Sequence, residues 1–351
     1  MKPAFILVND IHIDKQKGDL VKDIFRQIID IALEKDIEHV VIGGDVFTNR
    51  SGQPLDCLST FQDIIDMCAQ KEIHIDVIPG NHDKTDPDDY RSYVDIYRGN
   101  KTLSIYREGY SAMIGGCIVS FVPYFDDAKW KEEFNKAVAG MKRIKKARGI
   151  AAKSFLITHI AINGVRNNDG SEVVCDLKPT MFDCYDKVLV GHYHNASKIG
   201  KNISYTGSAY QNDFGENSND KGCSIIYDNG LVEFIPLKFP KYIKHVIDVN
   251  DSETLRNLLD VYEGETYNHV RFVFRGKKVD ASKVDLTYIS SKGIQCTFES
   301  VEENDAIETS TNADALSFDK KTIIKDFIRF CAENSIKGAN MKYGLNLIKN
   351  I

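Results

Sequence analysis

Five short apolar segments of the chain each end in side chains that can bind metal ions. Their tips read Asn9-Asp10-Ile11-His12, Gly43-Gly44-Asp45, Gly80-Asn81-His82-Asp83, His159 and Gly191-His192-Tyr193-His194. Carboxylate and amide oxygens combined with neutral imidazole nitrogens suit Mn²⁺, Fe²⁺ or Zn²⁺ better than Ca²⁺. In D-x-H and H-x-H, the two outer side chains point the same way where the backbone is extended. The pattern therefore predicts a metal centre in which Asp45, flanked by glycine, is placed to bridge two cations.

The histidines are concentrated at these tips. Five of the nine in the chain stand there, at positions 12, 82, 159, 192 and 194. A single histidine is usually an ordinary surface or core residue, but five in such positions are difficult to attribute to chance. We expect structural roles for the other four, which are His39, His74, His245 and His269.

The tips need a scaffold of strands that end at one edge. The apolar pattern predicts strands at 5–8, 39–42, 73–78, 155–158 and 187–190, and amphipathic helices at 20–35 and 55–70. Such an alternation indicates βαβ units, in which the carboxyl ends of the strands form the ligand crevice. Further short strands at 203–206, 223–227 and 231–235 favour a sandwich of sheets with helices outside.

The chain divides into four predicted parts. They are a core at 1–240, a small α+β domain at 241–299, a flexible acidic linker at 300–316 and a C-terminal pair of short helices at 317–351. In the small domain we expect strands at 242–249, 269–274 and 294–299, a helix at 252–259 capped by Ser252, and a helix near 281–290.

Composition excludes several classes of protein. The 351 residues are 42% hydrophobic and 27% charged, with a net charge of −6, which argues against a whole-surface nucleic-acid binder. No apolar run reaches the ~18 residues that span a bilayer, and the N-terminus does not resemble a secretory signal. The eight scattered cysteines indicate reduced thiols in a cytosolic protein. A basic helix at 131–148 either extends a positive field toward a phosphate or is simply a solvated face.

The ordered set D-x-H, G-D, G-N-H-D, H and G-H-x-H resembles the calcineurin-like metallophosphoesterases over about residues 1–240. A second set of motifs is similar to the SbcD-type nuclease subunits of the meiotic-recombination repair family. This set comprises Tyr205-Thr206-Gly207-Ser208, Phe214-Gly215-Glu216 and Lys221-Gly222. The segments at 116–124 and 232–236 most resemble the short T-even-phage members of that family. The resemblance implies an α/β (α+β) fold, a four-layer β-sandwich flanked by helices.

The resemblance also implies a role for each tip residue. One metal would be held by Asp10, His12, Asp45 and His194, and the other by Asp45, Asn81, His159 and His192. His82 would stand near the scissile phosphate, oriented by Asp83. Thr48 replaces a histidine that many cellular members use to position the DNA end, and Thr48, Ser208 and Tyr210 are candidate substrate contacts. The expected cofactors are two divalent ions, Mn²⁺ first, with Mg²⁺, Fe²⁺ or Zn²⁺ as alternatives.

The function implied is that of a Mn²⁺-dependent DNA exonuclease and endonuclease in an SbcCD-like repair and recombination complex. Because no G-x-x-x-x-G-K-[ST] loop occurs, the ATPase would be a separate chain, an SMC-like ABC ATPase of the SbcC type bound by 317–351. We also expect a homodimer, through 55–70 and 89–97, no membrane association, and the cytoplasm of a bacterial or phage-infected cell.

Two other functions compete with this one. The first is a calcineurin-like phosphodiesterase or phosphatase acting on a substrate other than DNA. Protein phosphatases of this kind usually carry Asp-Arg-Gly after the second motif and Asn-His-Glu in the third, which this chain lacks. The second is a scaffold without activity, which would be expected to have lost ligands, yet all seven are present.

Overall fold

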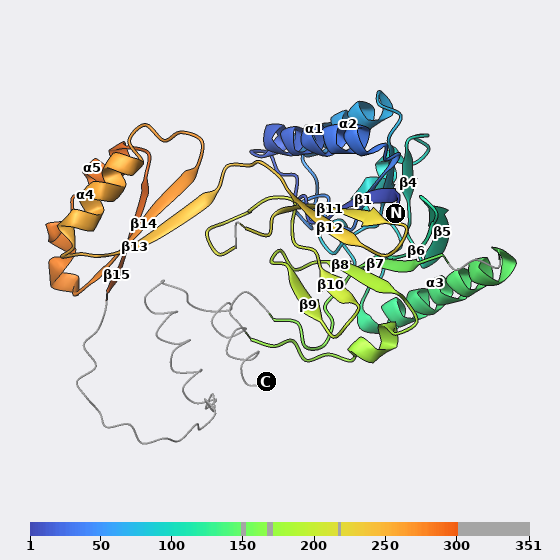
Figure 1. The fold of residues 1–351 in the computed structure, drawn as a ribbon. Helices are drawn as coiled ribbons and strands as arrows, with labels where there is room; N and C mark the ends of the chain where they lie inside the picture. The colour runs from blue at the N-terminus through green and yellow to red at the C-terminus, as the bar shows by residue number, and fades with distance from the viewer. Residues whose placement is uncertain (149–151, 167–170, 217–218, 301–351) are drawn as a thin grey trace, which may run out of the picture. The chain divides into compact units, whose positions relative to one another are not determined.

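The structure is a computed structural model that describes residues 1–148, 152–166, 171–216 and 219–300 (Figure 1). A compact unit spans Met1–Val301. The predicted linker at 300–316 and helix pair at 317–351 lie outside the described residues, apart from residue 300 at the end of the last strand. The predicted boundary at 240/241 remains a prediction.

The first sheet carries three of the predicted tips. Its order is β12 (Val232–Pro236), β11 (Gly222–Tyr227), β1 (Pro3–Val8), β2 (His39–Ile42), β3 (His74–Val77) and β4 (Leu103–Ile105). Strands β1 to β4 run parallel, whereas β11 is antiparallel to β1 and β12 to β11. The carboxyl ends of β1, β2 and β3 therefore meet at one edge.

The second sheet carries the other two tips. Its order is β5 (Tyr110–Ile114), β6 (Cys117–Val122), β7 (Ser154–His159), β8 (Lys187–Gly191), β10 (Ile203–Tyr205) and β9 (Ser197–Ile199). Strands β6, β7, β8 and β10 run parallel, and the outer strands β5 and β9 are antiparallel to their neighbours.

Helices cover the outer face of each sheet, giving four layers (Figure 1). Helices α1 (Gly18–Lys35) and α2 (Leu55–Ala69) pack on the first sheet through a core that includes Phe25 and Phe61. Helix α3 (Asp127–Arg148) packs on the second through Trp130. A third core, with Phe5 and Phe155 edge to face, fills the space between the sheets. The predicted fold class is therefore confirmed.

A smaller parallel sheet follows the sandwich. It consists of β13 (Tyr242–Asp248), β14 (His269–Gly276) and β15 (Gln295–Ser300), with α4 (Ser252–Val261) and α5 (Leu286–Ser291). The predicted cap of α4 at Ser252 is wrong: the carboxylate of Asp251 accepts the hydrogen bond from the amide of Thr254 at 2.9 Å. The predicted helix near 281–290 is also shorter, because a 3₁₀ turn at Lys278–Lys283 precedes α5.

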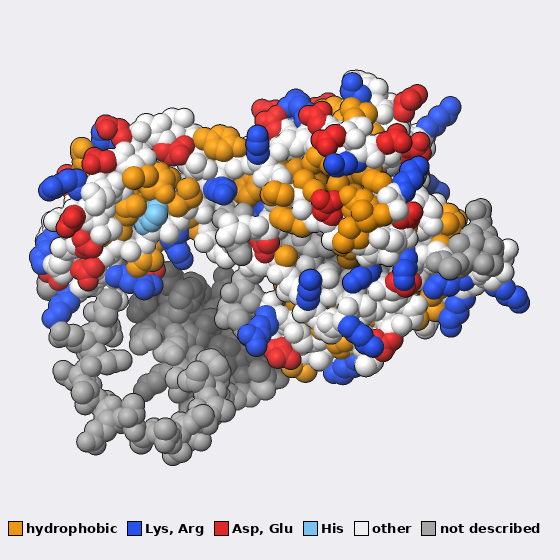
Figure 2. All heavy atoms as spheres, viewed as in Figure 1, with side chains coloured by type: hydrophobic (Ala, Val, Ile, Leu, Met, Phe, Trp, Pro, Cys, Tyr) orange, Lys and Arg blue, Asp and Glu red, His pale blue; other side chains and the backbone are white. Residues whose placement is uncertain are grey.

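Further 3₁₀ turns stand at Tyr93–Tyr97 and Pro179–Phe182. Among the helices that the structure describes, none is long and apolar enough to cross a membrane. Positive, negative and apolar side chains are interspersed on the face shown in Figure 2. The exposed apolar side chains include Phe234 in β12 and Leu231, which directly precedes that strand. The seven cysteines in the described ranges are all free.

Candidate metal centre

The five tips meet where the carboxyl ends of strands from the two sheets come together. The turn after β1 lies against the turn after β2, since the amides of Asp10 and His12 donate to the carbonyls of Gly44 and Asp45, each at 3.1 Å. From the second sheet, the amide of His192 donates to Oδ1 of Asp10 at 3.1 Å. The centre is therefore built by two sheets rather than at the rim of one.

The side chains converge through a left-handed backbone, which corrects our expectation of extended D-x-H and H-x-H segments. Only six non-glycine residues in the described chain have a positive φ, and four of these are predicted ligands: Asp10 (52°), His12 (42°), Asp45 (52°) and His192 (92°). Non-glycine residues adopt this conformation at a cost, and such strain is typically kept at functional sites.

Two glycines allow the strand tips to approach one another. A Cβ atom on Gly80 would lie 2.2 Å from Oδ1 of Asp45, and one on Gly44, whose φ is +104°, would lie 2.3 Å from Nδ1 of His159. Neither distance is compatible with a side chain. Both positions therefore require glycine for the ligands to come together.

The first group contains Asp10, His12, Asp45 and His194. The Nε2 atoms of His12 and His194 face each other at 2.9 Å, and Nε2 of His12 is 3.7 Å from Oδ2 of Asp45. Asp10, His12 and His194 each offer an atom within 4.8 Å of the others. At this distance the two Nε2 atoms can form a hydrogen bond only if one of them carries the hydrogen. A cation bound by both nitrogens would instead use the lone pair of each.

The second group surrounds the amide oxygen of Asn81. Nδ1 of His192 lies 2.9 Å from this oxygen, and Nε2 of His159 lies 3.1 Å from it. Nε2 of His159 also stands 3.3 Å from Oδ2 of Asp45. Asp45 thus contacts members of both groups, which is the arrangement that a bridging ligand requires.

The charge and burial of these groups suit a divalent cation. Burial raises the pKa of Asp10 and lowers the pKa values of His12 and His192 to about 3. Burial would also lower the pKa of His159, but the carboxylates of Asp45 and Asp10 raise it to about 9. His12 and His192 therefore resist protonation and keep a lone pair for a metal, whereas His159 shares the charge of the buried carboxylates; the oxygen and nitrogen donors match a transition metal.

The predicted pairing of His82 with Asp83 is wrong in its details. The carboxylate of Asp83 is fully buried and accepts from the backbone amides of Gly80, Val46 and Phe47 at 2.8, 3.2 and 3.0 Å. It therefore holds the turn that carries His82 and not the imidazole. Nδ1 of His82 lies instead 2.5 Å from the carbonyl oxygen of Thr48.

His82 stands beside the first group, with its ring centroid 5.0 Å from that of His12. Its Nε2 lies 3.2 Å from Nη2 of Arg50, a residue that the sequence analysis missed. The signal that could have found Arg50 is its place in the loop after Asp45, where we considered only position 48.

Two predicted substrate contacts are corrected. Ser208 and Tyr210 are completely buried. The Ser208 hydroxyl donates to the carbonyl of Tyr210 at 2.8 Å, and the Tyr210 hydroxyl donates to that of Ile11 at 2.8 Å. The Tyr210 hydroxyl thus holds the turn after β1 and the Ser208 hydroxyl bonds within its own segment, so neither is available to a substrate. Thr48 is exposed, and its hydroxyl donates to the carbonyl of His12 at 2.9 Å.

Glu216 also lies at the site, although no role was predicted for it. Its Oε1 lies 2.6 Å from Nδ1 of His194, and its Oε2 lies 3.1 Å from Nζ of Lys221. Burial alone would raise the pKa of Glu216, but the hydrogen bond and charge of His194, together with the charge of Lys221, lower it to about 2. Both residues belong to motifs that we had noted only for their resemblance.

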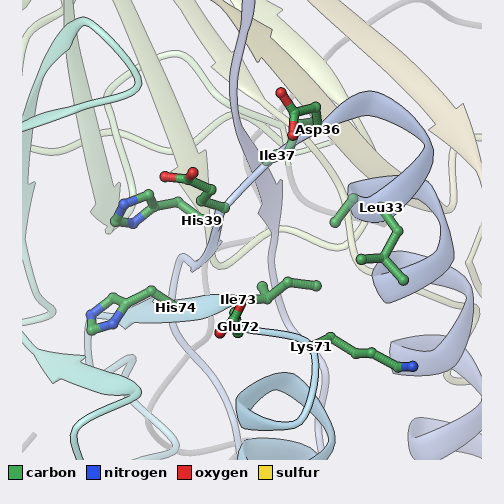
Figure 3. A pocket seen from close by; sticks show the side chains of 10 residues that line it. Leu33, Asp36, Ile37, His39, Lys71, Glu72, Ile73 and His74 are labelled. Atoms are coloured by element: carbon green, nitrogen blue, oxygen red, sulfur yellow. The ribbon is translucent and has the colours of Figure 1, made fainter.

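His39 and His74 lie at the opposite end of β2 and β3, apart from the metal centre. They line a pocket of about 440 Å³, where their imidazoles lie on the same side (Figure 3). Nδ1 of His39 is 2.7 Å from Oδ2 of the buried Asp76, and Nε2 of His74 is 2.8 Å from the hydroxyl of Ser104. Both rings have hydrogen-bond partners, consistent with structural roles.

The chain is similar in sequence to proteins of one known family. A family model described as calcineurin-like phosphoesterase matches residues 3–196. The SbcD component of the nuclease SbcCD from Staphylococcus saprophyticus is 25% identical over 240 residues, which cover 62% of this chain and 62% of that protein. The chain thus spans less than two thirds of the length of this relative.

Two solved structures share low similarity with the chain. The calcineurin-like phosphoesterase YfkN from Bacillus subtilis has a TM-score of 0.37 at 12% identity, covering 74% of this chain and 96% of its own. The nuclease MPE from Pseudomonas putida has a TM-score of 0.27 at 12% identity, covering 66% and 87%. The family match extends over more than half of the chain and includes all seven of its metal-binding candidates, from Asp10 to His194. The chain belongs to the calcineurin-like phosphoesterase family.

Proposed function

We propose that the chain is a Mn²⁺-dependent DNA nuclease that hydrolyses phosphodiesters with two metal ions. The observation that carries the proposal is the position of Asp45, which contacts both ligand groups where the carboxyl ends of strands from the two sheets meet. A phosphoesterase fold does not by itself name the substrate. DNA is supported by the similarity to a protein described as a nuclease over 62% of the chain.

In this proposal Asp10, His12, Asp45 and His194 hold one ion, and Asp45, Asn81, His159 and His192 hold the other. Bound divalent ions would polarise the phosphate and supply an activated water. Two carboxylates against two divalent cations leave a local charge of about +2, which draws a phosphate to a protein whose net charge is −6.

His82 is the proton donor in this scheme. The carbonyl of Thr48 accepts from Nδ1 of the ring, so Nε2 is the atom left to deliver a proton to the leaving oxygen. In the structure this Nε2 accepts from the guanidinium of Arg50, so it would take up its proton when the guanidinium turns to a phosphate. The guanidinium of Arg50, 3.2 Å from that Nε2, offers planar donors to a phosphate oxygen at the same place. His82 is half-buried and therefore within reach of a substrate, whereas His159 is fully buried.

The same proposal extends to the rest of the molecule. The chain would serve as the nuclease subunit of an SbcCD-like repair and recombination complex in the cytoplasm of a bacterial or phage-infected cell. The domain at 241–299 would cap the DNA, and 317–351 would bind an SMC-like ABC ATPase of the SbcC type. The chain would form a homodimer, for which α2 and the segment 89–97 present the exposed Leu55 and Ile96.

A phosphodiesterase acting on a substrate other than DNA would use the same ligands, so the substrate is the quantity to test. The full chain is incubated with Mn²⁺ and end-labelled duplex DNA, and in a parallel reaction with Mn²⁺ and a small chromogenic phosphodiester. We expect degradation of the DNA that chelator and Asp45→Asn both abolish. Metal-dependent turnover of the small ester with intact DNA would favour the alternative.

The ATPase partnership has its own test. Deleting residues 318–351 should leave metal-dependent nuclease activity intact while abolishing co-purification with the ATPase and stimulation by ATP. A truncated chain that binds the ATPase with unchanged affinity would contradict this part of the proposal. A truncated chain that aggregates would show that the segment instead belongs to the fold.

A further inference from the structure

His194 differs from His12 and His159 in what stands behind its ring. Its Nδ1 lies 2.6 Å from Oε1 of Glu216, while its Nε2 faces Nε2 of His12 at 2.9 Å. Nδ1 of His159 faces the backbone carbonyl of Gly43 at 3.0 Å, and Nδ1 of His12 is buried without a hydrogen-bond partner in the described residues. Of these three histidines, His194 alone has a charged partner on the side away from the metal group.

Glu216 is itself firmly held. Its Oε2 accepts from the backbone amide of Asn212 at 3.0 Å and pairs with the ammonium of Lys221 at 3.1 Å. Lys221 is 1% exposed, and its Nζ also donates to the carbonyl oxygen of His194. Lys221 thus contacts both the backbone of the ligand residue and the carboxylate behind its ring.

The buried ion pair of Glu216 and Lys221 needs an explanation, because it costs free energy. Burying an ammonium and a carboxylate costs free energy that their mutual attraction often fails to repay, and apolar residues could fill the same space. A carboxylate behind a ligand imidazole fixes the ring, keeps its hydrogen on the far nitrogen and makes the near nitrogen a better donor to a metal. The distances at Glu216 match this second role.

We propose that Glu216, held by Lys221, is a positioning residue that keeps hydrogen on Nδ1 of His194 and aims its Nε2 at the first metal position. This inference rests on the metal centre of the proposed function. It adds that the two metal positions differ: the one served by His194 depends on Glu216, whereas the one served by His159 and His192 does not.

The test is a calorimetric titration of Mn²⁺ into the metal-free full chain, with melting temperatures recorded in chelator. In Glu216→Gln, which keeps the shape of the side chain, we expect the dissociation constant of one binding step to rise about 10- to 100-fold. The weakened step should be the one that His194→Ala removes. The control is Glu233→Gln, which changes a carboxylate that bonds the Tyr227 hydroxyl, and it should leave both steps unchanged.

A purely structural ion pair makes a different prediction. Replacing both members of a buried pair by neutral residues is often harmless to stability. In the double variant Glu216→Gln/Lys221→Met, a structural role predicts that melting temperature and Mn²⁺ affinity are both close to those of the wild type. The positioning role predicts a melting temperature near that of the wild type with the same step still weakened about 10-fold or more. This variant also decides the question if Glu216→Gln alone does not fold.

The outcomes separate this inference from the proposed function. A wild type that binds two Mn²⁺ ions, with Glu216→Gln binding them equally tightly, overturns the inference alone. A wild type that binds Mn²⁺ but does not cleave DNA overturns the proposed substrate, and the binding data still decide the role of Glu216. A wild type that binds no Mn²⁺ overturns both.

Discussion

The two ends of strands β2 and β3 carry the same kinds of side chain, but these side chains differ in how their hydrogen-bonding atoms are paired. At the carboxyl ends, Asp45 and Asn81 present oxygens to imidazole nitrogens contributed by other strands. At the amino ends, His39 and His74 are direct neighbours across the strands, with Asp76 beside them. Both clusters combine histidine with a buried aspartate, yet only the first has the geometry of a metal centre.

The difference lies in how donors and acceptors are matched. Asp76 accepts from His39 at 2.7 Å and from the Tyr106 hydroxyl at 2.8 Å, so each oxygen of its carboxylate has a hydrogen-bond donor. At the other end, the Nε2 atoms of His12 and His194 point at each other, so their lone pairs converge on the same position. In this chain the cluster whose lone pairs converge is the candidate metal site, and the cluster in which each acceptor already has a donor is the structural one.

The backbone shows the same contrast. The remaining two non-glycine residues of positive φ, Asp36 and Glu72, line the pocket at the amino ends. Asp36 caps α1, where its amide bonds the carbonyls of Ala32 and Leu33. Left-handed residues at that end terminate helices, whereas at the carboxyl ends they turn ligands inward.

The largest expected effect is at Asp45. Asp45→Asn should reduce DNA hydrolysis on the order of 10³-fold or more, since loss of a single preorganised electrostatic group already costs about 10²–10³-fold. In chelator the variant should still fold, because the amide oxygen can accept from the His82 amide, now 2.8 Å from the carboxylate, although the variant loses the negative charge that faces His159. Chemical denaturation beside a nuclease assay checks both; full activity of the variant would contradict the bridging role.

At the carboxyl ends of the strands, a variant of His82 distinguishes a proton donor from a metal ligand. His82→Ala should slow turnover about 10²–10⁴-fold, the scale of a general acid, while binding of Mn²⁺ is retained. Single-turnover rates and metal content of the purified variant measure the two quantities. A matching loss of metal would show that His82 is a ligand.

Asp76 tests the amino end. Asp76→Ala should destabilise the fold by about 3 kcal/mol, because His39 and the Tyr106 hydroxyl lose a buried acceptor. The rate of the folded, metal-loaded variant should equal that of the wild type. Urea denaturation and a nuclease assay below the transition check this, and an intact fold with lost activity would break the distinction between the two ends.

The smallest expected effect is the pH dependence at His74. Burial lowers the pKa of His74 below the value in the unfolded chain, about 6.5. Below that pH the unfolded chain binds the proton more readily, so this contribution is present above pH 6.5 and is lost as the pH falls. Unfolding free energies of wild type and His74→Gln between pH 5 and 8 should show a shallower loss in the variant. An identical slope would contradict the assignment.

The sequence was sufficient for the strands and their tips, because buried parallel strands appear as apolar runs and β1, β2, β7 and β8 end in conspicuous polar residues. It could not predict the left-handed turns at Asp10 and His12, since these depend on hydrogen bonds to the neighbouring turn at Gly44 and Asp45. Nor could it predict that His39 and His74 are neighbours, because this requires the register of two strands 35 residues apart. Arg50 and Glu216 were missed because each acts through a contact distant in sequence.

The most direct test of the account is anomalous diffraction at the manganese absorption edge, from crystals of the full chain grown with Mn²⁺. The account predicts two peaks, both beside Asp45, one within reach of His12 and His194 and the other within reach of Asn81, His159 and His192. It predicts no peak between His39 and His74. A manganese peak at the His39 and His74 pair, or none beside Asp45, would contradict it.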